Sequence, residues 1–314
     1  MDDERFDALS RVLGSVASRR GALGLVAGLA GQGLSEVESK KRDRRGRRGQ
    51  HKGRGGSSGR VNAEITDGHL DEEAHPYVGL MVAQDAEGNA LWRCSGTLLS
   101  ETLFLTAGHC TAADGEDVPD HVEIWFDADV QSGIPANGYP NDGDVGGTPH
   151  THPNYNPDAF YLFDLGVVVL DEPMVMDEYG KLPALNQLDG LANKRGKQDV
   201  TFTAVGYGLQ KSFPTAAEWK ERADRIRMYA RPKLNQINSA YTGDFSILLS
   251  NNARTGGTCF GDSGGPNFIG TSNVIGGVTS YSNNDTCAGT GGVYRVDRAD
   301  DLDWLNEEFG DHLP

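Results

Sequence analysis

Long apolar runs, paired metal-binding cysteines and nucleic-acid-binding modules are all missing from this 314-residue chain. The apolar run from Gly24 to Ala30 falls well short of the roughly 20 residues that a membrane-spanning helix needs. The four cysteines include no Cys-x-x-Cys pair or Cys/His cluster, which argues against a zinc site. The acidic stretch from Asp127 to Asp144 lacks the Asp-x-Asp-x-Asp-Gly pattern and closing glutamate of a calcium loop. We therefore expect no transmembrane span, no metal and no cofactor.

Residues 1–39 have the composition of a targeting segment. Arg19 and Arg20 precede the Gly/Ala-rich run, and the small residues Val37 and Ser39 stand where a signal peptidase would cut. This pattern resembles a bacterial twin-arginine export signal, although the chain begins with acidic residues instead of the usual basic ones. A cytosolic amphipathic helix is the alternative interpretation. The export signal predicts a secreted protein.

Residues 40–64 form a basic, Gly/Ser-rich segment. Between Lys40 and Arg54 there are nine basic residues and one acidic residue, whereas the whole chain has a formal net charge of −16. Such a run cannot bury enough apolar surface to fold, so we expect a disordered linker or pro-segment. A tether to polyanions is the alternative, because clustered lysine and arginine bind phosphates without sequence specificity. Specific nucleic-acid binding is not expected.

From residue 65 onwards, short runs rich in valine, isoleucine, leucine and phenylalanine alternate with turn residues. Many short strands, with 42 glycines available for tight corners, indicate an all-β barrel or sandwich. Near the C-terminus, Asp297 can cap a helix in which Leu302, Leu305 and Phe309 recur at helical spacing. The predicted strands are 77–82, 96–99, 103–106, 122–126, 165–170, 200–205, 226–230, 245–249, 274–280 and 292–295.

Two distant segments carry residues suited to nucleophilic catalysis. Residues 106–110 read Thr-Ala-Gly-His-Cys, and residues 261–266 read Gly-Asp-Ser-Gly-Gly-Pro. A serine hydroxyl is a poor nucleophile at neutral pH and needs an adjacent base, which His109 could supply to Ser263. The imidazole needs a carboxylate on its far nitrogen. Asp164, which opens an apolar run, is one candidate for that carboxylate.

The alternative carboxylates are Asp158 and Asp171. The three segments resemble the base, carboxylate and nucleophile segments of the chymotrypsin/trypsin-like serine peptidase family, secreted bacterial type, in the same chain order. In that family the aspartate directly precedes the apolar run, which favours Asp164. The resemblance therefore implies a Ser263, His109 and Asp164 triad.

The resemblance covers residues 65–314 and implies a single peptidase domain. Its expected fold is two six-stranded antiparallel Greek-key β-barrels with a C-terminal helix, and the active site lies between the barrels. The backbone N–H groups of Gly261 and Ser263 would form the oxyanion hole, which binds the negative oxygen that develops during attack.

Four cysteines allow three pairings. The resemblance implies one disulfide from Cys94 to Cys110, which holds the histidine loop, and one from Cys259 to Cys287, which holds the serine loop. Disulfides persist in oxidising compartments, so these pairings agree with export.

The resemblance also implies a specificity pocket, which binds the substrate residue before the cleaved bond. It lacks a carboxylate at its base, so nothing would neutralise a buried lysine or arginine side chain of the substrate. Glycines at its base and far side predict a deep, uncharged slot for an apolar or aromatic residue. Preference for glutamate, held by hydroxyls of the pocket, is the alternative. The implied pocket residues are Gly257 and Thr258 at the base, Ser280, Tyr281 and Ser282 along one wall, and Gly292 at the far side.

The sequence thus predicts a secreted, monomeric serine endopeptidase that cleaves proteins or peptides through an acyl-enzyme. A catalytically silent relative that acts as a surface binding protein is the alternative. Ile65 resembles the first residue of the mature family enzymes, but Glu64 precedes it where arginine or lysine is usual. Activation by cleavage at this point is therefore left open.

Overall fold

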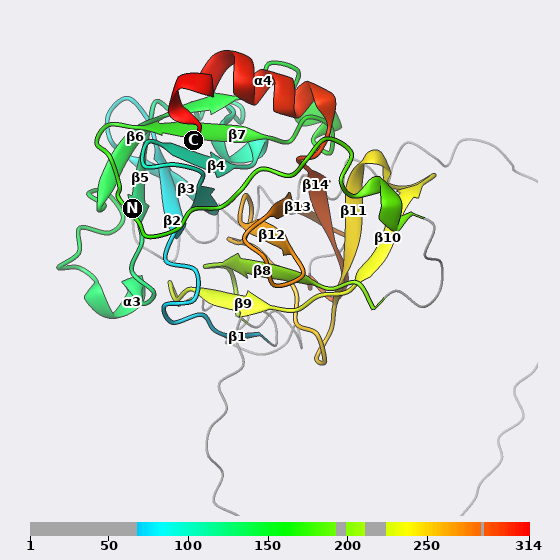
Figure 1. Ribbon diagram of the computed structural model, residues 1–314. Coiled ribbons are helices and arrows are strands. Elements are labelled where there is room, and N and C mark those ends of the chain that lie inside the picture. Colours follow the sequence, from blue (N-terminus) through cyan, green and yellow to red (C-terminus); the bar gives the residue numbers. More distant parts are fainter. Residues whose placement is uncertain (1–67, 193–198, 211–223, 284–285) are drawn as a thin grey trace, which may run out of the picture.

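The computed structural model describes residues 68–192, 199–210, 224–283 and 286–314. The predicted export signal, the basic segment and the predicted start at Ile65 lie outside these residues. Two β-rich halves lie side by side, with the first in cyan to green and most of the second in yellow to orange (Figure 1). In the described part of the chain, no helix is long and apolar enough to cross a membrane.

The N-terminal half is a closed antiparallel barrel with the strand order β2-β3-β4-β7-β6-β5. Its strands form where the sequence offers β-branched and aliphatic residues; β7, for example, contains three consecutive valines. All seven residues of β2 are buried. The strands are β2 (Val78–Gln84), β3 (Ala90–Leu98), β4 (Leu103–Thr106), β5 (His121–Trp125), β6 (Val145–Thr151) and β7 (Gly166–Leu170).

The C-terminal half is a barrel-like antiparallel sheet of eight described strands, in the order β1-β9-β8-β12-β13-β14-β11-β10. We expected a barrel of six strands here. Among the eight described strands, β1 comes from the chain upstream of the first barrel and pairs with β9, and β1 and β10 form the two edges. The strands are β1 (His69–Leu70), β8 (Phe202–Gly206), β9 (Met228–Ala230), β10 (Leu234–Ser239), β11 (Gly243–Asn251), β12 (Pro266–Ile269), β13 (Ile275–Ser282) and β14 (Gly289–Arg295).

One apolar cluster runs through both halves. It includes Leu105 and Val167 from the closed barrel and Phe268 and Val278 from the second sheet. Because apolar burial is the main favourable term in folding, this shared cluster holds the two halves in one arrangement. Residues far apart in the sequence can therefore be held in fixed positions between them.

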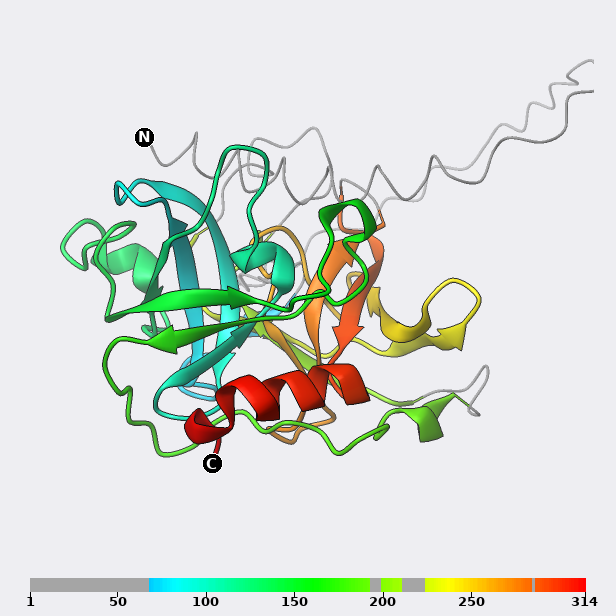
Figure 2. The ribbon, with the colours of Figure 1, turned by 90° about the horizontal axis from the view of Figure 1, so that it is seen from above.

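The C-terminal helix α4 (Ala299–Phe309) crosses back over the first barrel, as the red helix in Figure 2 shows. Its Trp304 and Phe309 contact His152 and His150. The predicted cap was wrong: Arg298 occupies the cap position, and Asp297 instead accepts two hydrogen bonds from the buried Arg295. The other short helices are α2 (Gly108–Thr111), α3 (Val130–Gly133), η1 (Pro157–Ala159), η2 (Asp189–Leu191) and η4 (Gly310–His312).

Both predicted disulfides are confirmed. Cys94 bonds to Cys110 with a Cα–Cα distance of 6.2 Å, and Cys259 bonds to Cys287 with a distance of 5.4 Å. The first bond ties β3 to α2, and the second ties the segment before Ser263 to the chain leading into β14. All four cysteines of the chain are thereby used.

A buried ion pair joins the start of the described chain to both halves. The guanidinium of Arg227 donates to the carboxylate of Asp71 at 2.9 Å, and both side chains are at most 1% exposed. Arg227 also donates to the carbonyl oxygen of Phe126 at 2.7 Å and to the hydroxyl of Tyr207 at 3.1 Å. The buried guanidinium thus has partners in the first barrel, the second sheet and the segment that precedes both.

Replacing Arg227 with methionine should lower the free energy of unfolding by about 3–5 kcal/mol, because the buried Asp71 carboxylate would lose its counter-charge. The matched control is Lys233→Met, which removes a pair whose side chains are 47% and 97% exposed and should cost at most about 1 kcal/mol. Denaturant unfolding with intact disulfides measures both. Equal losses in the two variants would contradict the prediction.

Candidate active site

His109 is presented at the rim of the first barrel. Strand β4 ends at Thr106, and the short helix α2 that follows carries His109. The Cys94–Cys110 disulfide fixes this helix to β3, and the indole of Trp92 donates to the carbonyl oxygen of Cys110 at 3.0 Å. The side chain of His109 is 22% exposed, so its ring remains open to a substrate.

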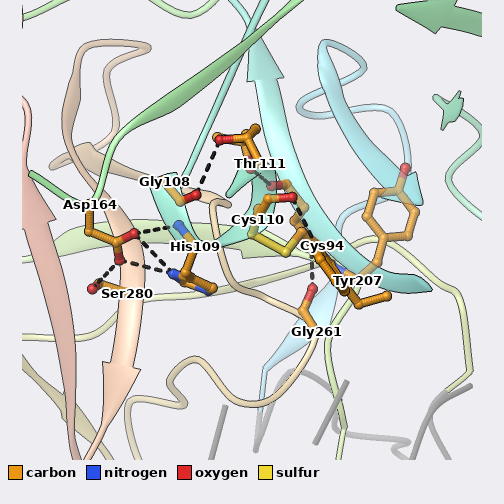
Figure 3. The surroundings of a disulfide bond; sticks show 12 residues. Cys94, Gly108, His109, Cys110, Thr111, Asp164, Tyr207, Gly261 and Ser280 are labelled. Atoms are coloured by element: carbon orange, nitrogen blue, oxygen red, sulfur yellow. Dashed lines mark hydrogen bonds and ion pairs between the residues drawn. A yellow bond between two sulfur atoms is a disulfide. The ribbon is translucent and has the colours of Figure 1, made fainter. Parts of the chain in front are cut away.

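Asp164 faces the ring of His109. Its carboxylate is fully buried, and both of its oxygens lie 3.0 Å from Nδ1 of His109 (Figure 3). The backbone N–H of His109 also donates to this carboxylate at 2.9 Å, and the hydroxyl of Ser280 donates to it at 2.5 Å. The alternatives Asp158 and Asp171 are exposed at the surface. The structure therefore brings Asp164 to the imidazole.

The pKa of His109 reflects two opposed effects. Burial lowers it, because the charged ring loses contact with water, whereas the charge and hydrogen bond of Asp164 raise it. The charge and the hydrogen bond of Asp164 together outweigh burial, so the pKa of His109 lies above the ordinary value of 6.5. The carboxylate thus stabilises the imidazolium that forms when His109 takes up a proton.

Ser263 lies on a loop that is packed against the histidine segment. A side chain on the neighbouring Gly264 would overlap Thr106 Oγ1 at 2.0 Å and the backbone nitrogen of Ala107 at 2.8 Å. Gly264 has a φ of +78°, a conformation that favours glycine. The carbonyl oxygen of Ser263 accepts from the N–H of Ser95 at 2.8 Å, and Ser263 itself is partly exposed.

The residue before the serine is a buried acid. Asp262 is fully buried, and burial raises its pKa to about 6, while the backbone N–H groups of Cys259 and Gly208 and the nearby charge of Arg93 lower it. Those two N–H groups donate to the carboxylate at 2.8 Å each. The preceding Gly261 has a φ of +93°, which a larger residue would adopt only with strain. The loop conformation is therefore fixed on both sides of Asp262.

The predicted pocket glycines are both covered by neighbouring side chains. A Cβ on Gly257 would lie 2.3 Å from Asn251 Cγ, and a Cβ on Gly292 would lie 2.3 Å from Cζ of Tyr281. The Tyr281 hydroxyl lies 3.2 Å from the hydroxyl of Ser246, which holds the ring in this position. The amide of Asn251 and the ring of Tyr281 thus occupy space beside the two glycines.

The remaining pocket residues lie nearby. Thr258 is buried, and its hydroxyl would be 3.0 Å from a Cβ on Gly291, the residue that pairs with Ser282 in the sheet. Ser280, which we expected in the pocket wall, directs its hydroxyl to Asp164 instead. The sequence contains no signal for this contact, because a serine inside a strand does not reveal which distant group its hydroxyl will face.

One group of potential metal ligands occurs among the described residues. Donor atoms of Cys94, His109 and Cys110 lie within 4.8 Å of one another. The two sulfur atoms are bonded to each other, so neither is a thiolate that could ligate a metal. This cluster is therefore part of the histidine segment and not a metal centre.

Comparisons with known proteins agree on one family. The family model named Trypsin matches residues 70–304. Serine protease 1 of Drosophila melanogaster is 26% identical over 80% of this chain and 87% of its own length. The Trypsin of Saccharopolyspora erythraea is 26% identical over 70% of this chain and 87% of its own length. A solved structure of HL collagenase has 20% identity and a TM-score of 0.58 over 78% of this chain and 98% of that chain, which shows a shared fold.

Proposed function

This chain belongs to the trypsin family, and we propose that it is a serine endopeptidase with Ser263 as nucleophile, His109 as general base and Asp164 as the carboxylate that orients the base. The observation that carries the proposal is the buried Asp164 carboxylate at 3.0 Å from Nδ1 of His109. That contact leaves Nε2 as the free ring nitrogen, which is the one that a base needs to accept the serine proton.

The proposed reaction has two halves. In the first, the Ser263 oxygen attacks the carbonyl carbon of a peptide bond while its proton moves to Nε2 of His109. The imidazolium, stabilised by Asp164, then gives that proton to the leaving amine, and an acyl-enzyme remains. In the second half, water attacks the acyl carbon while His109 takes its proton, the bond from that carbon to the Ser263 oxygen breaks, and His109 returns the proton to this oxygen as the carboxylic acid product leaves. Atoms and protons balance with no cofactor.

We assign the oxyanion hole to the backbone N–H groups of Gly261 and Ser263. The positive φ of Gly261 is the feature that supports this assignment, since it sets the direction of the peptide that carries its N–H. Fixed donors at such a position typically contribute about 2.7–4 kcal/mol each to the transition state.

The family and the disulfides support an extracellular location for the protein. Trypsin-like proteases are typically secreted and act on proteins, and the disulfides Cys94–Cys110 and Cys259–Cys287 persist in oxidising compartments. We propose an extracellular, monomeric enzyme that is exported through the twin-arginine-like signal in residues 1–39. The basic residues 40–54 are proposed to contact polyanions only without specificity.

Replacing Ser263 or His109 with alanine should each lower kcat by a factor on the order of 10⁶, and the double variant should be no worse than either, because both act in one proton-transfer step. His121→Ala is the control: this histidine pairs with Glu123 at the surface and should leave kcat unchanged. Peptide hydrolysis and covalent labelling of Ser263 by a fluorophosphonate probe measure the effect. A wild-type protein that is not labelled would support the silent binding protein instead.

The rate should rise with pH. Neutral His109 is the working base, so kcat/KM should increase as pH passes the raised pKa of the free enzyme and then level off. Asp164→Asn removes the effect that raises this pKa, so its midpoint should move to lower pH and its plateau should fall by a factor on the order of 10⁴. Profiles between about pH 5 and 9 test this. A flat wild-type profile, or an unmoved midpoint in the variant, would contradict the prediction.

We propose that the pocket prefers an apolar or aromatic residue before the cleaved bond. Its base, Gly257 beside the Asn251 amide, carries no charge, and Tyr281 supplies an aromatic wall over Gly292. A lysine or arginine side chain would lose its hydration there without gaining a counter-charge. Because the side chains of Asn251 and Tyr281 fill part of the expected slot, the pocket should be shallower than the sequence predicts. It should accept an aliphatic or aromatic side chain of the substrate but not a longer one.

A library of peptides should therefore be cleaved fastest after Phe, Tyr or Leu, since burying such a side chain contributes on the order of 2 kcal/mol. Thr258→Val, which removes a hydroxyl with little change in shape, should leave this order unchanged. Cleavage led by arginine or lysine would show that the pocket is wrongly assigned. Cleavage led by glutamate and lost in Thr258→Val would establish the glutamate alternative.

A further inference from the structure

Ser95 connects the loop of the nucleophile to the first barrel through two hydrogen bonds, and a third bond joins it to Tyr207, which follows β8. This residue of β3 is fully buried, next to the disulfide-bonded Cys94. Its backbone N–H donates to the carbonyl oxygen of Ser263 at 2.8 Å, and its hydroxyl donates to the carbonyl oxygen of Gly261 at 2.9 Å. The same hydroxyl accepts from the N–H of Tyr207 at 3.0 Å. Figure 3 shows Gly261 and Tyr207 close to Cys94, the residue that precedes Ser95.

The hydroxyl acts on one particular peptide unit. The carbonyl of Gly261 and the N–H of Asp262 belong to the same rigid plane. Ser95 binds the carbonyl end, and the N–H end donates to the carbonyl oxygen of Cys259 at 3.0 Å. This plane separates the two N–H groups that we assign to the oxyanion hole. Fixing it at both ends sets the directions of the N–H groups of Gly261 and Ser263.

We infer that Ser95 is a positioning residue that orients the oxyanion hole through the Gly261–Asp262 peptide. This inference rests on the proposed function. Without the hydroxyl, the Gly261 carbonyl and the Tyr207 N–H would both be buried and unpaired, and rotation of the peptide would cost less. The effect belongs to the transition state, because the oxyanion exists only there.

Ser95 also makes contacts that would be expected if it only packed the interior. Its carbonyl oxygen accepts from the hydroxyl of Thr106 at 2.9 Å, and Gly265 packs against its Cβ. Two substitutions separate hydrogen bonding from packing. Ser95→Ala leaves a methyl group, which fills the space and keeps water out. Ser95→Gly leaves room for one water molecule, which would have the Gly261 carbonyl and the Tyr207 N–H as partners.

In the full chain, Ser95→Ala should lower kcat by about 10- to 100-fold with KM changed by less than about threefold. Ser95→Gly should recover much of this loss through the bridging water. A packing role predicts the reverse order, since glycine in a strand is more destabilising than alanine. The control is Thr203→Val in β8. The buried hydroxyl of Thr203 also donates to a backbone carbonyl, that of Gly270 at 2.6 Å, and its removal should leave kcat at the wild-type value.

Hydrogen exchange followed by mass spectrometry gives a readout that does not require activity. Peptides covering residues 259–265 should exchange faster in Ser95→Ala than in the wild type, and Thr203→Val should not change them. Wild-type kcat in Ser95→Ala, glycine worse than alanine, or unchanged exchange in this loop would each overturn the inference. If the wild type neither hydrolyses peptides nor binds a fluorophosphonate, the proposed function fails, and the exchange result still decides whether Ser95 holds the loop.

Discussion

The buried carboxylate of Asp164 is the constraint on which the site depends. It receives the backbone N–H and ring of His109 from the first barrel and the hydroxyl of Ser280 from β13 of the second sheet. A buried carboxylate without such partners would be strongly unfavourable, so the native arrangement is the one in which all three donors converge. The Asp164 carboxylate therefore couples the orientation of the imidazole to the docking of the two halves.

A second group of buried polar contacts also crosses between the halves. Arg227 is bonded to Asp71 and to the hydroxyl of Tyr207, and the backbone N–H of Tyr207 is bonded to Ser95 beside the serine loop. If all partners of a buried ion pair were replaced together by well-packed apolar residues, stability would often be unchanged, but the apolar residues would not fix an orientation. A site that must hold reacting groups to within a fraction of an ångström gains from directional bonds of this kind.

The sequence was sufficient for the parts that rest on motifs and strong patterns. The disulfides and the strands with aliphatic runs, such as β4 and β7, were confirmed. Strands β1, β6, β10 and β12 were missed. The sequences of β6 and β10, Val-Gly-Gly-Thr-Pro-His-Thr and Leu-Asn-Gln-Ile-Asn-Ser, have no apolar alternation and owe their form to neighbouring strands. The contacts of Ser95 and of Asp297 were out of reach for a related reason: a single polar side chain does not reveal which distant backbone group will face it.

Asp262 explains why the serine loop needs contacts on both sides. Burial raises its pKa from 3.8 to about 6, so the ionised form is less favourable in the folded protein than in water. The protonated carboxyl is the form that the folded protein favours. The stability that it provides is fully present below pH 3.8 and is lost as the pH rises through the folded-state pKa of about 6. At neutral pH, where a histidine base works, the loop therefore holds a buried carboxylate whose direct donors are the N–H groups of Cys259 and Gly208. Ser95 binds the carbonyls of Gly261 and Ser263, the residues on either side, so the loop keeps its shape while the charge between them stays buried.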